Sequence, residues 1–433
     1  MNFSRAMNRR LPGLLFALFL LLPFAAAHAD NFSTLKSLIE SGRYDAARAF
    51  VAKASAGTAN GALEIAFVDA LILKVEGRYD EAARRMRAIL SRNPNLTRVR
   101  GELADTLLRM GDTEGASFNF QRLADSSTDA QQRSFYDSYL NAIRQKRPWT
   151  LDAYVALAPS TNINNGVSGD TVVIGGVPFD AASHESKSGI GASFGVAGTY
   201  RFDLSPKWDL TFGGRSSGNL YADSTFDQVY GSAFAEFAYT APKWRVGVGL
   251  AGDRAVMGWR GYNWDYGPQL SFSRDLGRFG GVVATAGWRK IGYDDLTGLS
   301  GDETDFAIRY RQSLTPSSSF GLGFAYSRAN TDATFNGYDG YKPSIELYKE
   351  LPWGMLGSAQ VAYQWRTYRA NFPLTGRPRA DGQLSIDLAV TFRNLSWKGF
   401  APKIEYTYTQ NDSNVQLYSY RSHTIGLFLS KKY

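Results

Sequence analysis

Apolar and polar residues alternate along the chain from Trp149 to the last residue, Tyr433, in segments that are separated by alternately short and long breaks. Successive side chains of a β-strand point to opposite faces, so residues of one parity share a face. One apolar face is formed by Trp244, Val246, Val248 and Leu250. The segments begin near residues 149, 188, 208, 228, 244, 262, 279, 303, 319, 340, 355, 381, 400 and 418. The pattern predicts about 14 antiparallel strands, an even number as in bacterial single-chain barrels.

The opposite parity of these strands carries charged and amide side chains, which in a lipid-embedded barrel face the lumen. A soluble β-sandwich would instead bury its apolar face. The tryptophans favour the membrane, because all nine follow residue 148 and lie near the predicted strand ends, where aromatic girdles flank a bilayer. We therefore predict an all-β transmembrane barrel. Its candidate luminal contact residues are Arg309, Arg311, Glu346, Gln364 and Arg366.

Residues 1–29 have the pattern of a cleaved signal peptide. Arg5, Arg9 and Arg10 precede an apolar run, and Ala27-His28-Ala29 supplies a cleavage site of small residues. We expect cleavage after Ala29 and export of the mature chain. An uncleaved membrane anchor is the alternative, although Pro23 suits it poorly.

Residues 30–147 contain a sequence repeat that predicts helix pairs. Gly42, Gly77 and Gly111 begin related segments at intervals of 35 and 34 residues. This interval is that of the tetratricopeptide repeat. We predict an all-α tetratricopeptide-repeat domain over residues 30–147, followed by the barrel over residues 148–433. Because such arrays present extended surfaces, they bind partners more often than they catalyse reactions.

Arginines cluster within the predicted repeats. The cluster contains Arg84, Arg85, Arg87, Arg98 and Arg100. Solvated charges on a helix face are one interpretation. The other is a groove for an acidic peptide, since the guanidinium fork matches carboxylate geometry.

Composition excludes several kinds of chemistry. The chain has no Cys, which excludes disulfides and thiolate metal sites. Its net charge of +8 includes three signal-peptide arginines. The positive charge that remains on the mature chain is too small to indicate binding of nucleic acid. Of three histidines, only His184 and His423 follow the signal peptide. A lipase-like Ser-His-Asn arrangement around His423 remains the catalytic alternative. We predict no enzymatic activity, cofactor or metal.

The alternation of short and long breaks predicts the orientation of the barrel. Short turns of outer-membrane barrels face the periplasm and long loops face the exterior. With an even number of strands, the chain enters and leaves the barrel on the same side. The N-terminus and C-terminus of the barrel segment, and with them the repeat domain, would therefore lie on the periplasmic side of a Gram-negative outer membrane. The first long loop, 159–185, contains a small hairpin around Gly175 and Gly176.

A short element joins the first strand to this loop. It consists of Pro159, Ser160, Asn162, Ile163 and Asn164, with Thr161 between them. With the signal peptide, the short repeat domain and the barrel, it resembles the surface lipoprotein assembly modulator family, called Slam. The architecture covers essentially the whole mature chain.

The resemblance implies an outer-membrane translocator, of the kind also called a type XI secretion system, and no catalytic residues. Its clients would be surface lipoproteins or related haem- and iron-scavenging proteins. The repeat domain would handle the client and the barrel would provide passage. Other expected partners are the barrel-assembly machinery and outer-membrane lipid, for a monomer that does not bind nucleic acid. A polysaccharide exporter of the repeat-plus-barrel type and a small-molecule porin are the alternatives.

Overall fold

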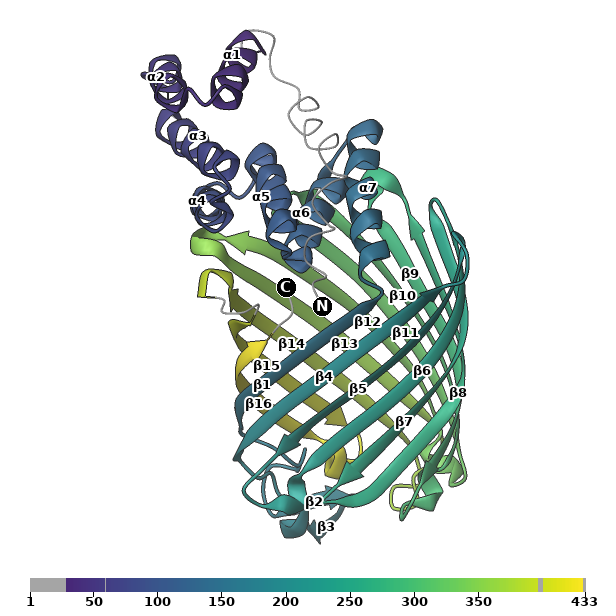
Figure 1. Cartoon of the computed structure of the whole chain (residues 1–433). Coiled ribbons are helices and arrows are strands. Elements are labelled where there is room, and N and C mark those ends of the chain that lie inside the picture. Colours follow the sequence, from purple (N-terminus) through teal and green to yellow (C-terminus); the bar gives the residue numbers. More distant parts are fainter. Residues whose placement is uncertain (1–28, 59, 396–399, 431–433) are drawn as a thin grey trace, which may run out of the picture.

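The computed structural model describes residues 29–58, 60–395 and 400–430, which form a helical N-terminal part lying across one end of a closed β-barrel (Figure 1). Residues 1–28, and with them nearly all of the predicted signal peptide, lie outside the described residues. Among the helices of the described ranges, none has the length and apolar character needed to cross a membrane.

The helical part consists of hairpins whose turns are made by the repeated glycines. Gly42, Gly77 and Gly111 have φ values of 72°, 79° and 82°, a left-handed conformation that glycine adopts without a steric penalty. Ala47, Ala82 and Ala116 are fully buried, so the hairpins pack closely. The helices are α1 (Ala29–Glu40), α2 (Tyr44–Ala54), α3 (Gly61–Val75), α4 (Tyr79–Arg92), α5 (Thr97–Met110), α6 (Thr113–Ser126) and α7 (Ala130–Lys146). The predicted repeat fold is confirmed.

The barrel closes through the pairing of its first and last strands, β1 and β16. Its fourteen strands are β1 (Trp149–Ser160), β4 (Gly189–Asp203), β5 (Trp208–Leu220), β6 (Gln228–Ala241), β7 (Trp244–Met257), β8 (Arg260–Asp275), β9 (Gly281–Tyr293), β10 (Gly301–Thr315), β11 (Ser318–Thr331), β12 (Tyr338–Leu351), β13 (Met355–Asn371), β14 (Pro378–Phe392), β15 (Ala401–Ser413) and β16 (Tyr420–Ser430). Every observed start lies within three residues of the predicted one. The predicted strand number and antiparallel order are confirmed.

The apolar parity of the strands lies on the outer surface. On β7, Val246, Val248 and Leu250 are 41%, 52% and 65% exposed, far more than the core residues of a soluble sheet would be. Near the strand ends, Trp208 stacks on Phe237 with ring centroids 4.8 Å apart. The outer surface is therefore suited to lipid, as the alternation predicts.

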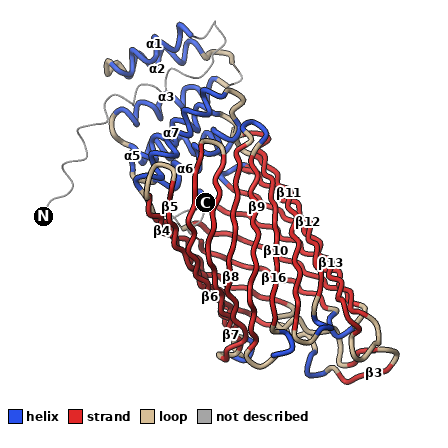
Figure 2. Tube along the Cα trace, turned by 90° about the vertical axis from the view of Figure 1, so that its right-hand side faces the viewer, coloured by secondary structure: helices blue, strands red, loops and turns tan. Residues whose placement is uncertain are grey.

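The long loops form their own small core at the barrel end away from the helices (Figure 2). The predicted hairpin is present as β2 (Thr171–Ile174) and β3 (Val177–Asp180). Val172 and Ile174 of this hairpin pack with Phe372 and Val415, which belong to the two loops before β14 and β16. The first long loop is thus held against loops from the far end of the sequence.

Candidate functional site

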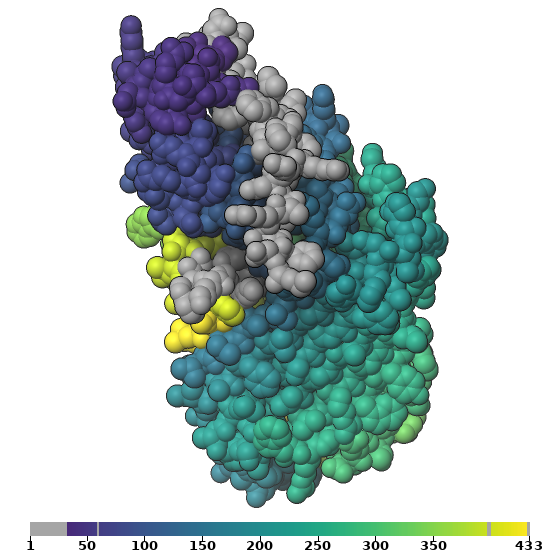
Figure 3. Space-filling view, in the orientation of Figure 1, coloured from purple at the N-terminus to yellow at the C-terminus, as the bar shows by residue number. Residues whose placement is uncertain are grey.

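The barrel mouth at the short-turn end is the candidate site, because the helical domain lies across it. Polar contacts join the helices and their loops to the rim of the barrel, among them contacts to the β10–β11 hairpin and to the end of β8. Asn95 accepts a hydrogen bond from Ser317 at 2.6 Å, and Arg122 donates to Ser319 at 3.4 Å. Arg133 of α7 lies 3.4 Å from Asp275 at the end of β8. The space-filling view shows the helices resting on this end of the barrel (Figure 3).

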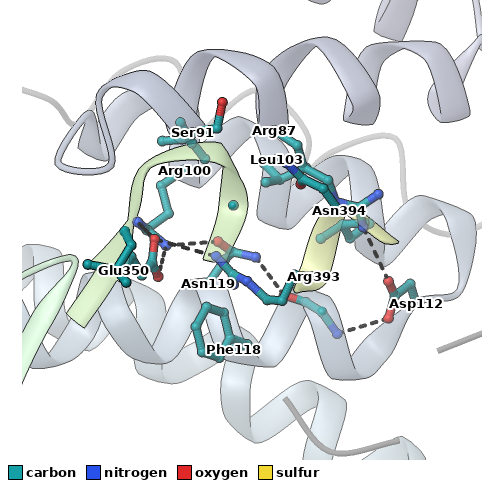
Figure 4. A pocket seen from close by; sticks show the side chains of 15 residues that line it. Arg87, Ser91, Arg100, Leu103, Asp112, Phe118, Asn119, Glu350, Arg393 and Asn394 are labelled. Atoms are coloured by element: carbon teal, nitrogen blue, oxygen red, sulfur yellow. Dashed lines mark hydrogen bonds and ion pairs between the residues drawn. The ribbon is translucent and has the colours of Figure 1, made fainter. Parts of the chain in front are cut away.

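A buried ion cluster joins α5 to the end of β12 (Figure 4). The Arg100 guanidinium on α5 donates through Nη1 and Nη2 to the two Glu350 carboxylate oxygens, at 3.0 and 2.7 Å. The same groups donate to Asn119 and to the carbonyl of Pro94. Arg393, in the turn after β14, places Nη2 3.5 Å from Glu350. We call Arg100, Glu350 and Arg393 the interface cluster.

The interface cluster is largely shielded from water. The side chains of Arg100 and Glu350 are 1% and 4% exposed. Arg393 lies over the Phe118 ring of α6 at 4.7 Å. Burial lowers the pKa of Arg393, although the charge of Glu350 opposes this shift. A bidentate Arg–carboxylate pair has fixed geometry, so the cluster sets one position of α5 on the rim.

The covalent connection between helices and barrel is short and ordered. Helix α7 ends at Lys146 and strand β1 begins at Trp149. The Arg147 guanidinium lies 2.7 Å from Glu114 and stacks over the Trp149 ring at 4.2 Å. The Pro148 carbonyl accepts a hydrogen bond of 2.8 Å from the backbone N–H of Arg201 on β4. The last helix is thereby positioned at the rim of the mouth.

Below the helices, the lumen holds three cavities of about 880, 800 and 450 Å³. The first two are lined by α6 and α7 as well as by barrel strands. Arg311 lines all three, and Arg309 lines the second and third. Both guanidiniums bind the carboxylate of Glu346, at 3.3 Å for Arg309 and 3.5 Å for Arg311. Their side chains remain 60% and 64% exposed, so they present positive charge to the lumen.

The other two predicted luminal residues lie closer to the long loops. Arg366 donates to the Gln364 amide oxygen at 2.9 Å, and its guanidinium lies 5.6 Å from the Tyr338 ring centre. The five candidates therefore form two groups along the lumen. Their contact with a client stays a prediction.

The arginines of the repeat domain occupy different surroundings. Arg84 and Arg85 are exposed, and Arg87 lies 3.9 Å from Asp112. Arg98 lies over Phe67 at 5.6 Å, where burial lowers its pKa to about 10. Arg100 belongs to the interface cluster and is directed at the barrel. An acidic-peptide groove formed by the exposed arginines stays a prediction.

The sequence indicated the luminal face of Glu350 but not its partner, and it did not indicate Arg393 at all. Glu350 continues the polar parity of Lys342 and Glu346 on β12, which gave a signal for the luminal face but none for a partner. Arg393 follows directly after a strand, where a basic residue is ordinary. Their partner Arg100 lies 250 positions from Glu350 in sequence.

The element from Pro159 to Asn164 fixes the base of the first long loop. The Asn162 amide donates to the carbonyls of Gly166 and Arg421, at 2.8 and 3.0 Å, and its oxygen accepts from the Gly166 N–H at 2.9 Å. Asn164 bonds to the backbone of Glu185 and Lys187 on the other side of the loop. Ser160 bonds to Thr424 on β16. The element therefore ties both ends of the loop to the β1–β16 seam.

His423 lies on the outer, apolar parity of β16. Its Nδ1 is 2.9 Å from the Tyr406 hydroxyl, and its ring lies 4.8 Å from that of Tyr408. Among the described residues, no group of three or more His, Asp or Glu side chains is arranged to hold a metal ion.

Comparison with known proteins identifies relatives over most of the chain. The family model described as surface lipoprotein assembly modifier matches residues 149–433, and a tetratricopeptide-repeat model matches residues 76–136. Surface lipoprotein assembly modifier 1 of Haemophilus influenzae (strain Rd) is 22% identical over 383 residues, covering 85% of this chain and 77% of that protein. Surface lipoprotein assembly modifier 1 of Neisseria meningitidis serogroup B is 21% identical, and the match covers 80% of this chain and 71% of that protein.

Solved outer-membrane barrels are more distant. The toluene transporter TodX of P. putida has a TM-score of 0.37 at 10% identity, covering 67% of this chain and 92% of that one. Acinetobacter baumannii OccAB4 has a TM-score of 0.34 at 9% identity, covering 66% and 99%.

Proposed function

The chain belongs to the surface lipoprotein assembly modifier family, and we propose that it moves client proteins from the periplasm to the cell surface. The family description and the barrel fold support an outer-membrane location and a role in surface lipoprotein assembly. We propose surface lipoproteins or related secreted proteins as the clients.

In this proposal the helical domain is periplasmic. It lies at the short-turn end of the barrel, and short turns of bacterial outer-membrane barrels face the periplasm. The barrel-assembly machinery would insert the chain as a monomer, with the apolar outer face against lipid.

The observation that carries the proposal is the position of the repeat domain across the barrel mouth. A repeat array offers an extended surface for protein segments. Here α6 and α7 line the first two luminal cavities together with the strands, so a segment bound by the helices would be beside the lumen. The role is one of handling and passage, without a chemical step.

Gene deletion followed by protease shaving of intact cells tests the proposal. We expect specific surface proteins to disappear from the shaved fraction while their cellular amounts persist, and to return when the full chain is restored. An unchanged surface proteome, with the candidate clients expressed, would refute it. Loss of surface polysaccharide with intact surface proteins would instead favour the polymer exporter.

A further inference from the structure

The contacts between the helical domain and the barrel differ in chemistry. The Asn95–Ser317 and Arg122–Ser319 contacts each include a neutral group, and the carboxylate paired with Arg133, Asp275, is 44% exposed. Ser317 and Ser319 are buried, but neither of their contacts is an ion pair. Water reaches the Asp275 carboxylate, so its pair with Arg133 contributes little net stabilisation. The interface cluster of Arg100, Glu350 and Arg393 is the buried charged contact among those described above.

The cluster lies well away from the covalent connection. Glu350 is at the end of β12, which is five strands from β1 around the closed barrel. The helices continue into β1 through Arg147 and Pro148. Rotation of the helical domain about Pro148 would therefore separate α5 from β12 without breaking the chain, and would also break the exposed Arg201–Arg144 hydrogen bond and the Arg147–Trp149 contact.

Buried charges make a contact that is strict in geometry but modest in net stabilisation, because desolvation offsets most of the attraction. The Nε atoms of Arg100 and Arg393 are buried and have no hydrogen-bond partner among the described residues. These unsatisfied donors raise the free energy of the closed arrangement. When the helices move away, all three groups can be hydrated. A permanent interface would more often be apolar.

We propose that the interface cluster is a latch, which holds the helical domain closed over the barrel mouth and releases it by rotation about Pro148. The open arrangement would expose the luminal cavities lined by α6 and α7 to a client. That last step rests on the proposed function. The latch itself is a property of the purified protein, so its test is separate from any surface-display assay.

The chain suits site-specific labelling because it contains no native Cys. Ala88→Cys on α4 and Lys243→Cys in the β6–β7 turn place spin labels at two exposed positions outside the cluster. Pulsed electron spin resonance of the full chain in nanodiscs then reports the distance between helices and rim. The test variant is Glu350→Gln. The matched control is Glu346→Gln, which removes a carboxylate on the same strand and face that also binds two arginines.

We expect a single short-distance population in the parent protein and in Glu346→Gln. In Glu350→Gln the uncompensated arginines should raise the ratio of open to closed molecules on the order of a hundredfold, which appears as a longer-distance population. A distribution like that of the parent, or equal opening in both variants, would overturn the proposal. If Glu350→Gln yields no heat-modifiable barrel, Arg100→Met tests the same contact from the helical side, and a closed distribution there overturns it equally.

Discussion

Replacement of Asn162 by Ala should release the first long loop from the β1–β16 seam. The Asn162 side chain is buried at 4% exposure and makes three hydrogen bonds with backbone groups of Gly166 and Arg421. Alanine leaves these backbone groups without partners in a buried position. The local loop structure loses the stabilisation that they provided, while the barrel strands remain paired.

The magnitude follows from the number of hydrogen bonds. A buried hydrogen bond contributes about 1 kcal/mol, and unsatisfied partners add to the loss. Because one amide donates two of the three bonds, we expect the substitution to lower the free energy of local loop opening by about 2–3 kcal/mol. This corresponds to roughly a thirty- to hundred-and-fiftyfold larger open population.

Hydrogen exchange with mass spectrometry on the protein in micelles measures this population. Peptides from residues 161–188 should exchange faster by that factor, and peptides from β7 should be unchanged. Asn162→Asp is the graded control, because it keeps an acceptor for the Gly166 N–H and loses both donated bonds. Asn164→Ala should cost less, since its bonds are exposed and water can replace them. Exchange in Asn162→Ala within twofold of the parent would refute this account.

Three further predictions concern the helical domain, the lumen and the domain boundary. Burial alone would raise the pKa of Asp105, but the nearby Lys74 ammonium and a second cation hold that pKa below its ordinary value. This stabilisation is therefore present above the unfolded-state pKa of about 3.9 and is lost as pH falls through the folded-state pKa. In melting followed by circular dichroism of the helices, we expect the midpoint temperature to be constant from neutral pH to about pH 5 and to fall below about pH 4. Glu346→Gln leaves two luminal guanidiniums unneutralised, so single-channel reversal potentials should shift towards anion selectivity; an unchanged potential would contradict the luminal assignment. A chain of residues 149–433 contains all fourteen strands and should still insert as a heat-modifiable barrel, and absence of the gel shift would move the boundary.

The local patterns in this sequence determine the elements. A strand alternates with period two, so apolar parity gave each strand start within three residues and assigned residues such as Arg309 and Glu346 to the luminal face. The repeat interval located the turns at Gly42, Gly77 and Gly111, because the left-handed turn conformation recurs with each helix pair. The aromatic residues indicated the bilayer. These properties depend on neighbours in sequence and are readable there.

Which side chains pair with each other across long sequence distances was decided by the tertiary structure. Nothing in the arginine run distinguishes Arg100 from Arg84, yet Arg100 lies buried against Glu350 and Arg84 is exposed. The Asn162–Arg421 bond likewise depends on closure of the barrel between its first and last strands. A parity pattern gives the face of each side chain but not the element packed against it. That element is set by how the helices pack on the rim and how the strands close, which brings together residues more than two hundred positions apart.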